Sequence, residues 1–412
     1  MGIRVDSTGR SLSIFGAILL MLAGLFLSRA VLSIALMLFV ALALLHKNIG
    51  AQLRNFFKTP LLAGMALLFL LPFVSGLWSA DKGEWLDLVR IKLPLLFLPL
   101  AFAGNWQLPR RQWRAVALFF LALVAAGTAW SFEKYWTDRN AVAESYLKAK
   151  VFLTPLQNDH VRFSWMVAVA VLLCIWFVET GKKWQRLMAA FLALWFSFYL
   201  HLLAARTGLL SLYLVLLFYA GWKLFKSRNK AVVAITVAIA LAMPLLAWYA
   251  LPTFQNRIKY FMYDHSFIRS GAYLPGGNDG NRVLSYRAGW HLLKNNPLGV
   301  GAGDVFAETD AWYREHVPGM QPSDKLYPNS EWLLYGCSTG WPGVLIFTGV
   351  MLLPLFYQPP VHRWCWLALS GTAAATFLFD IGLEVQFGVF LYAFLPLWWW
   401  KWFWSEMENS VL

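Results

Sequence analysis

Residues 251–271 read LPTFQNRIKYFMYDHSFIRSG, residues 276–304 read GGNDGNRVLSYRAGWHLLKNNPLGVGAGD, and residues 327–343 read YPNSEWLLYGCSTGWPG. This part of the chain is polar and charged, whereas the sequence before and after it consists of hydrophobic blocks. A connection between two neighbouring membrane helices needs only a handful of residues. We therefore interpret residues 251–330 as the functional loop, and the rest of the chain as the membrane scaffold that holds it.

The composition is that of a membrane protein. Of the 412 residues, 59% are hydrophobic and 14% are charged, whereas charged residues make up about 25% of a typical soluble domain. The net charge of +14 does not indicate nucleic-acid binding, because Lys and Arg gather in short clusters between apolar blocks, as membrane topology requires. Cys174, Cys337 and Cys365 lie in or beside apolar segments without CxxC spacing, so the sequence predicts neither a metal site nor a disulfide framework.

About twelve of the apolar blocks have the length of a membrane span. They cover residues 11–28, 30–45, 61–78, 89–103, 116–130, 161–178, 187–203, 207–225, 231–251, 332–357, 364–379 and 387–404. The sequence therefore predicts an all-α polytopic membrane protein, with residues 1–412 forming a single integral membrane domain. The loop at 251–330 then lies between the ninth and tenth transmembrane helices and is expected to be partly helical.

The distribution of positive charge predicts the orientation. If the N-terminus is cytoplasmic, every second connection is basic, as expected for cytoplasmic connections. These connections hold Lys47, Arg54 and Lys58; Arg110, Arg111 and Arg114; Lys182, Lys183 and Arg186; Lys223, Lys226, Arg228 and Lys230; and His362 and Arg363. Both termini are then cytoplasmic, and the loop at 251–330 and a smaller loop at 133–160 lie outside. The tryptophans from Trp398 to Trp404 are expected to form an interfacial belt.

Several cations lie on the outer side, where topology does not favour them. Arg206 stands between two spans without an acidic residue near it in sequence, and a buried arginine costs roughly 2.5–3.5 kcal/mol on insertion scales. The others are Arg90, Lys92, His160, Arg162, Arg282 and Arg287. Such cations can lie singly at the interface, or they can converge on an anion. A lipid phosphate or pyrophosphate fits the second interpretation, because the guanidinium fork binds such oxygens bidentately.

The run GVGAGD at 299–304 is similar to a phosphate-binding loop only in its glycines. Neither a preceding strand nor a following Lys-Ser/Thr pair accompanies it. We interpret it as a tight turn that lets backbone segments pack closely.

Three motifs in this order resemble those of the bacterial O-antigen ligases and the related O-antigen polymerases. They are AARTGLL at 204–210, SYRAGWHLLKNNPLGVGAGDVF at 285–306 and YPNSEWLLYGCSTGWPGVLIF at 327–347. The resemblance implies a GT-C-like glycosyltransferase fold in the bacterial inner membrane. It also implies transfer of O-antigen from undecaprenyl pyrophosphate to the lipid A-core oligosaccharide at the periplasmic face, without a metal or other cofactor.

The resemblance assigns the essential arginines of the family to Arg206 and Arg287. The catalytic histidine of the family falls at Asn329, and a neutral amide cannot take a proton from an acceptor hydroxyl. Asn329 could still orient a substrate by hydrogen bonding. The base would then be His316 or Glu331, with Asp304 and Asp324 as further candidates.

For the pyrophosphate itself, the sequence suggests a clamp of positive side chains. We expect Arg206, Arg287 and Arg162 to hold it, with Arg90 or Lys92 assisting. His160 and Arg282 are further candidate contacts.

Other functions remain open at this point. An O-antigen polymerase or a protein O-oligosaccharyltransferase would use the same donor. A flippase or transporter of lipid-linked glycans would also explain many spans and outer cations. The absence of an evident internal repeat disfavours a transporter, as do the size of the outer loop and the lack of intramembrane acidic residues other than Asp380 and Glu384 near a helix end.

Overall fold

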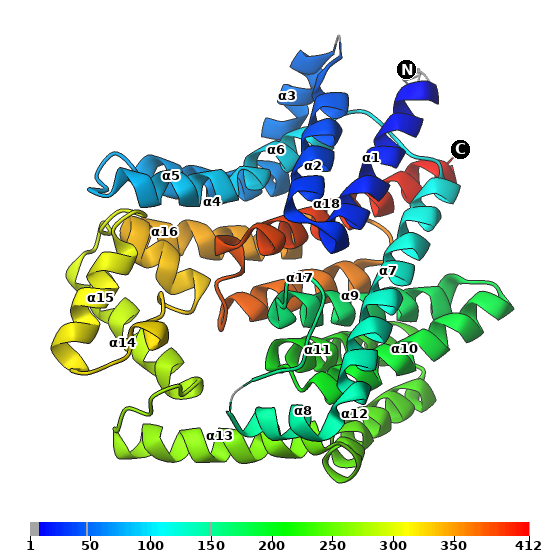
Figure 1. Ribbon diagram of the computed structural model, residues 1–412. Coiled ribbons are helices and arrows are strands. Elements are labelled where there is room, and N and C mark those ends of the chain that lie inside the picture. The colour runs from blue at the N-terminus through cyan, green and yellow to red at the C-terminus, as the bar shows by residue number, and fades with distance from the viewer. Residues whose placement is uncertain (1–7, 47, 149, 412) are drawn as a thin grey trace.

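The computed structural model describes residues 8–46, 48–148 and 150–411, and over these residues its regular structure is helical. Lys47, counted above among the basic residues, lies outside this range. The first helices are α1 (Thr8–Leu27), α2 (Arg29–Leu44), α3 (Ile49–Lys58), α4 (Pro60–Ser75), α5 (Lys82–Lys92), α6 (Pro94–Phe102), α7 (Arg110–Thr137), α8 (Arg139–Ser145) and the short η1 (Tyr146–Lys148). There follow α9 (His160–Thr180), α10 (Lys183–Leu203), α11 (Arg206–Trp222), η2 (Lys223–Ser227), α12 (Lys230–Ala250), α13 (Pro252–Ser270), α14 (Asp279–Asn295), α15 (Val305–His316), η3 (Pro322–Asp324), α16 (Glu331–Phe356), α17 (Arg363–Phe377), η4 (Gly382–Glu384) and α18 (Gln386–Val411) (Figure 1).

Local sequence signals set many of these boundaries. The side chains of Ser28, Asp81, Asp159 and Asn229 accept hydrogen bonds from backbone N–H groups in the first turns of α2, α5, α9 and α12. Such residues stabilise a helix start, because its first N–H groups have no partner inside the helix. Gly271, at φ 70°, ends α13 in the left-handed conformation that glycine adopts without steric cost.

The chain is a multi-pass membrane protein, with fewer clear spans than the sequence predicts. Among the described helices, seven are long and apolar enough to cross a membrane, or eight if the bent pair α2 and α3 is one span. The expected number of about twelve is therefore not shown. One reason is that block 89–103 is divided between α5 and α6, and another is that α4 and α17 have only 16 and 15 residues.

The helices differ in how much of their surface the protein itself covers. In the most apolar part of α9, 83% of the residues are buried, whereas in α12 only 11% are. An apolar helix that the protein does not cover is suited to face lipid. We therefore place α9 at the centre of the bundle and α12 at its lipid-facing edge.

The tryptophans of α18 correct the expectation of an interfacial belt. Trp398, Trp399 and Trp402 are completely buried, and Trp398 stacks on Trp402 with ring centroids 6.2 Å apart. The reason is the position of α18, which contacts α6, α9 and α17 on different sides. These indoles therefore pack inside the protein, whereas Trp404 is 37% exposed.

The loop predicted at 251–330 is partly helical, as expected, and contains α13, α14, α15 and η3. In Figure 1, α14 and α15 lie at one side of the molecule, and the start of α1 and the end of α18 lie together at the other. Segments of the smaller loop pack on α13, where Asn256 Nδ2 donates a hydrogen bond to the Ala143 carbonyl at 2.8 Å. The two loops thus share one face of the protein. That this face is periplasmic stays a prediction.

The glycine run at 299–304 is a docking turn, which confirms its interpretation from the sequence. A Cβ atom on Gly301, at φ 95°, would lie 2.4 Å from Ser79 Oγ, and one on Gly303 would lie 2.1 Å from the Asp81 carbonyl oxygen. The Asp304 carboxylate accepts hydrogen bonds from the N–H groups of Ala80 and Asp81 at 2.6 and 2.8 Å. The turn therefore joins the α4–α5 connection to the region around α14, and Asp304 has a structural role there.

Candidate active site

Arg206 is the first residue of α11, where that helix begins against α9. Gly208 permits this contact, because a Cβ atom there would lie 2.5 Å from Ser164 Cβ. The Arg206 guanidinium forms an ion pair with Asp279, the first residue of α14, and its Cζ lies 5.4 Å from the ring centroid of Phe261. The acidic partner that is missing near Arg206 in the sequence is thus supplied by a residue 73 positions later.

A buried carboxylate on α13 fixes the start of α14. Asp264 is completely buried and accepts hydrogen bonds from the N–H groups of Asn278, Asp279 and Gly280 at 2.9, 2.6 and 3.2 Å. A carboxylate is favourable there because the start of a helix carries free donors and partial positive charge. Asp264 therefore positions Asp279 and, through it, Arg206. Sequence analysis missed Asp264, since its partners belong to another helix.

Two further arginines lie near Arg206. Arg257 on α13 is only 8% exposed. The charges of Arg206, Asp279 and Arg282 lie near enough to influence its pKa. Burial and then the charge of Arg206 lower the pKa of Arg257. Within the described part of the chain, Nε and Nη1 of Arg257 and Nη2 of Arg206 are buried without a hydrogen-bond partner. We call Arg206, Arg257 and Arg282 the arginine cluster.

His160 and Arg162, which begin α9, differ in their surroundings. The charges of Arg257 and Arg282 act on His160, which therefore lies beside the arginine cluster. Arg162 is buried, with Nη2 2.9 Å from Asp380 Oδ2 and Nη1 3.5 Å from Asp159 Oδ1. The positive charge of Arg162 is thus balanced by acidic neighbours, which indicates a structural role.

Lys92 and Glu331 also belong to a buried ionic group. Lys92 pairs with Glu384 and lies 5.1 Å from the ring centroid of Tyr335. Glu331 is completely buried and accepts a hydrogen bond from the Leu383 N–H at 2.5 Å. These contacts join α5, α16 and η4 and leave neither side chain open to an acceptor.

Arg90 lies two residues before Lys92 but faces solvent. Its side chain is 65% exposed, and it pairs with Asp87 at 3.0 Å. Surface pairs of this kind contribute little to stability. The structure does not bring Arg90 to the arginine cluster.

Asn329 connects α14 to the segment after α17. Its N–H donates to Ser285 Oγ at 3.2 Å, and its Nδ2 donates to the Phe379 carbonyl at 3.4 Å. The side chain is nearly buried. The geometry therefore supports a positioning role for the amide at this place.

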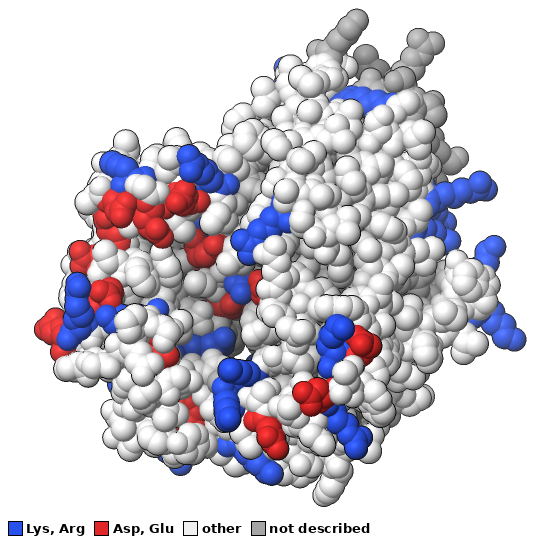
Figure 2. Space-filling model, viewed as in Figure 1, with Lys and Arg blue, Asp and Glu red and all other residues white. Residues whose placement is uncertain are grey.

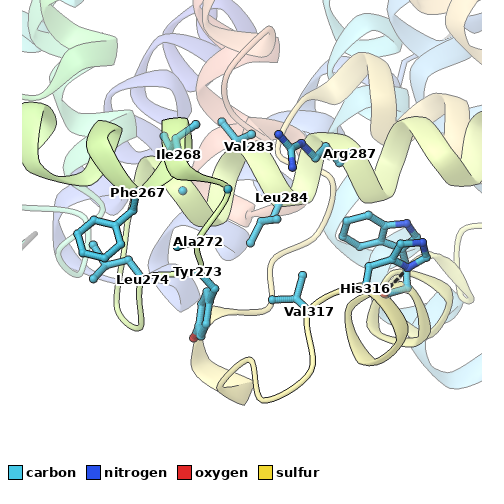
Figure 3. Close-up of a pocket in the computed structure, with 13 residues that line it drawn as sticks. Phe267, Ile268, Ala272, Tyr273, Leu274, Val283, Leu284, Arg287, His316 and Val317 are labelled. Atoms are coloured by element: carbon cyan, nitrogen blue, oxygen red, sulfur yellow. Dashed lines mark hydrogen bonds between the residues drawn. The ribbon is translucent and has the colours of Figure 1, made fainter.

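Arg287 and His316 line one pocket of about 250 Å³ between α13, α14 and α15 (Figure 3). The His316 ring stacks on Trp312 with centroids 4.5 Å apart, and its Nδ1 lies 3.1 Å from the Trp312 carbonyl oxygen. Arg287 follows Arg282 by five residues, which places the two about 140° apart around α14. Arg282, and not Arg287, thus lies on the side of α14 that faces Arg257.

In Figure 2 the surface is hollowed near its centre, and Lys and Arg side chains lie in and around the hollow. The arginine cluster contains three positive charges, and Asp279 is the acid that pairs with it. Over the described residues, no group of three or more His, Cys, Asp or Glu side chains is placed to hold a metal ion. The electrostatics of the cluster therefore favour an anion.

Residues 191–348 match the family model described as O-Antigen ligase. The chain carries an O-antigen ligase family domain. This match confirms the resemblance drawn from the motifs, and it implies a glycosyl-transfer enzyme. A comparison with curated proteins gives no match.

The O-antigen ligase domain extends from α10 into α16. It contains the arginine cluster, Asp264 and the pocket of Arg287 and His316, whereas His160 and Arg162 lie before it. The cluster is formed by residues from three helices, α11, α13 and α14. Arg257, like Asp264, is a residue that sequence analysis missed. Its position seven residues after the end of the apolar α12 was the signal that could have drawn attention to it.

Proposed function

We propose that the protein is an O-antigen ligase, which transfers O-antigen from undecaprenyl pyrophosphate to the lipid A-core oligosaccharide at the periplasmic face of the bacterial inner membrane. The observation that carries the proposal is the arginine cluster inside the O-antigen ligase family domain. Guanidinium groups bind phosphate oxygens through paired, charge-assisted hydrogen bonds. The buried N–H groups of Arg257 and Arg206, which have no hydrogen-bond partner among the described residues, are suited to this purpose.

An apolar groove next to the cluster supports a lipid-linked donor. The groove has a volume of about 350 Å³ and lies between the last turns of α10 and α12, with Phe198, Met243 and Leu246 in its lining. Leu251, at its end, leads directly into α13, which carries Arg257. The hydrocarbon chain of the donor would occupy the groove while its pyrophosphate reaches the cluster.

The proposed reaction requires little chemistry from the protein. The bond between the anomeric carbon and the pyrophosphate oxygen breaks, and its electron pair stays on the pyrophosphate. An acceptor hydroxyl forms the new bond from the opposite side and releases its proton, which gives inversion at the anomeric carbon. Preorganised cations stabilise the charge on the leaving group, and such stabilisation is usually the largest catalytic contribution.

Two imidazoles are candidate proton acceptors, His160 beside the arginine cluster and His316. A neutral imidazole is the usual general base of enzymes near neutral pH. His316 lies instead in the Arg287 pocket, and Glu331 is buried against Leu383. Asn329 then contributes by holding α14 in place rather than by moving a proton.

The test uses purified protein in detergent with lipid-linked O-antigen and lipid A-core. Arg206→Ala and Arg282→Ala are expected to reduce transfer at least 100-fold, whereas Arg90→Ala, the matched exposed arginine, leaves it unchanged. Normal transfer by both cluster variants would refute the assignment. His160→Gln and His316→Gln, measured in parallel, decide between the two bases, since only the variant that lacks the base loses turnover.

A gene deletion separates the ligase from the alternative enzymes. Loss of a ligase leaves the lipid A-core uncapped and lets lipid-linked polymer accumulate, whereas loss of a polymerase gives a core with a single repeat unit. Transfer in detergent without an ion gradient would exclude a flippase or transporter as the explanation of the arginine cluster.

A further inference from the structure

Another cavity lies at the other end of α11 from Arg206. It has a volume of about 830 Å³ and is formed by the last turns of α9 and α11, the π-helical η2, and the connection between α16 and α17. The 17 residues of α11 place it about 25 Å from Arg206. That distance approaches the thickness of a bilayer core, which is about 30 Å. The cavity therefore opens at the opposite membrane face from the arginine cluster.

The wall of the cavity is aromatic. Trp176, Trp222 and Trp364 line it, and Trp222 stacks on Trp364 with ring centroids 5.1 Å apart and planes 16° apart. Indole rings are enriched where lipid headgroups meet the hydrocarbon core, because one part of the ring is apolar and the other is polar. The exposed Leu217 and Phe225 continue this wall toward the lipid.

The charge of the cavity is positive after its internal pairs are taken into account. Its acidic side chain, Glu179, lies 2.7 Å from Lys223 Nζ and accepts a hydrogen bond from the Tyr219 hydroxyl at 2.7 Å. Lys226 and Arg363 also line it, and over the described residues neither side chain has an ion-pair partner. Two positive charges therefore remain available at the mouth of the cavity.

We propose that this cavity binds the headgroup of an anionic phospholipid. Basic pockets between membrane helices on the cytoplasmic side are suited to such headgroups, and the predicted topology places Lys226 and Arg363 on that side. The phosphate would lie between Lys226 and Arg363, and the acyl chains would follow Phe225 and Leu217 into the bilayer. π-Helical turns are frequent at functional sites, and η2 contains both Phe225 and Lys226, which line the cavity. The site is independent of the proposed transfer reaction.

The experiment is native mass spectrometry of the delipidated full-length protein, titrated with dioleoyl phosphatidylglycerol or dioleoyl phosphatidylcholine. We expect one phosphatidylglycerol to bind more tightly than phosphatidylcholine. Lys226→Gln/Arg363→Gln should weaken phosphatidylglycerol binding about 30-fold, since each cation near an anionic lipid surface contributes about 1 kcal/mol. It should leave phosphatidylcholine binding unchanged. Lys226→Arg/Arg363→Lys should retain the preference.

The matched control is Lys183→Gln/Lys230→Gln, which removes two exposed charges from the same predicted side but outside the cavity. It should bind phosphatidylglycerol like the wild type. Equal loss in the control, or equal binding of both lipids by the wild type, would overturn the proposal. Competition by glycerol 1-phosphate at the same concentration as the lipid would also overturn it, because the site would then recognise a soluble phosphate. Unchanged melting of all variants in detergent confirms that they are folded.

Discussion

Replacing Arg257 by methionine should stabilise the donor-free protein while it removes transfer activity. Arg257 is only 8% exposed, and Nε and Nη1 are buried without a partner among the described residues. The nearby charges include two arginines and one aspartate. A buried charge that is not paired is unfavourable to folding. Methionine keeps much of the apolar stem and removes the charge.

The magnitude follows from the unpartnered donors. Each unsatisfied buried donor costs about 1–3 kcal/mol, so the loss of two of them in Arg257→Met should raise the free energy of unfolding by about 2–6 kcal/mol. For a chain of 412 residues, the unfolding entropy of about 2.1 cal/mol/K per residue converts this gain to a Tm increase of about 2–7 °C. Transfer should fall about 100-fold, because a donor aimed at the leaving pyrophosphate is lost.

Arg162→Met is the matched control, because Arg162 is equally buried but paired with Asp380 and Asp159. Its loss leaves buried carboxylates without their counter-charge, which typically destabilises a protein by about 3–5 kcal/mol. The two substitutions should therefore move the Tm in opposite directions. Thermal unfolding and transfer are measured in the same detergent. If Arg257→Met lowers the Tm as Arg162→Met does, and the folded variant retains normal turnover, Arg257 is a structural residue and the reasoning is wrong.

Three further predictions concern the scaffold. Lys92→Met should destabilise the protein by about 3–5 kcal/mol, because it leaves the Glu384 carboxylate without its ion-pair partner. Arg90→Met should change the stability by less than about 0.5 kcal/mol. Similar Tm values for the two variants would contradict the buried ionic group. Gly301→Ala should lower the Tm by several degrees, because it places a Cβ atom 2.4 Å from Ser79 Oγ at a φ of 95°, while Gly16→Ala, with nothing within 4 Å, should not. The hydrogen bond from Lys325 lowers the pKa of Asp310. The stability that this carboxylate contributes is therefore present above its ordinary pKa of about 3.8 and is lost as the pH falls through the lowered value. The Tm difference between wild type and Asp310→Asn should shrink on acidification, and a difference that grows would refute the pairing.

The sequence alone determined the class of the protein. Hydrophobic blocks of spanning length interrupted by a polar stretch specify a multi-pass membrane protein, because hydrocarbon selects apolar side chains regardless of tertiary contacts. Arg206 could be singled out for the same reason, as a cation beside apolar helices. The glycines at 299–304 were also interpreted correctly, since glycine is the residue that permits close backbone approach.

Only the tertiary structure decided which cations act together. The family resemblance singles out Arg287, whereas the turn of α14 places Arg282 near Arg257 and Arg287 in the pocket with His316. Arg90 and Lys92 likewise face solvent and a buried carboxylate, respectively. Trp398, Trp399 and Trp402 of α18 are buried because other helices surround them, which composition cannot reveal. Hydropathy depends on each residue singly, whereas a binding site depends on distances between residues of different helices, and folding alone sets those distances.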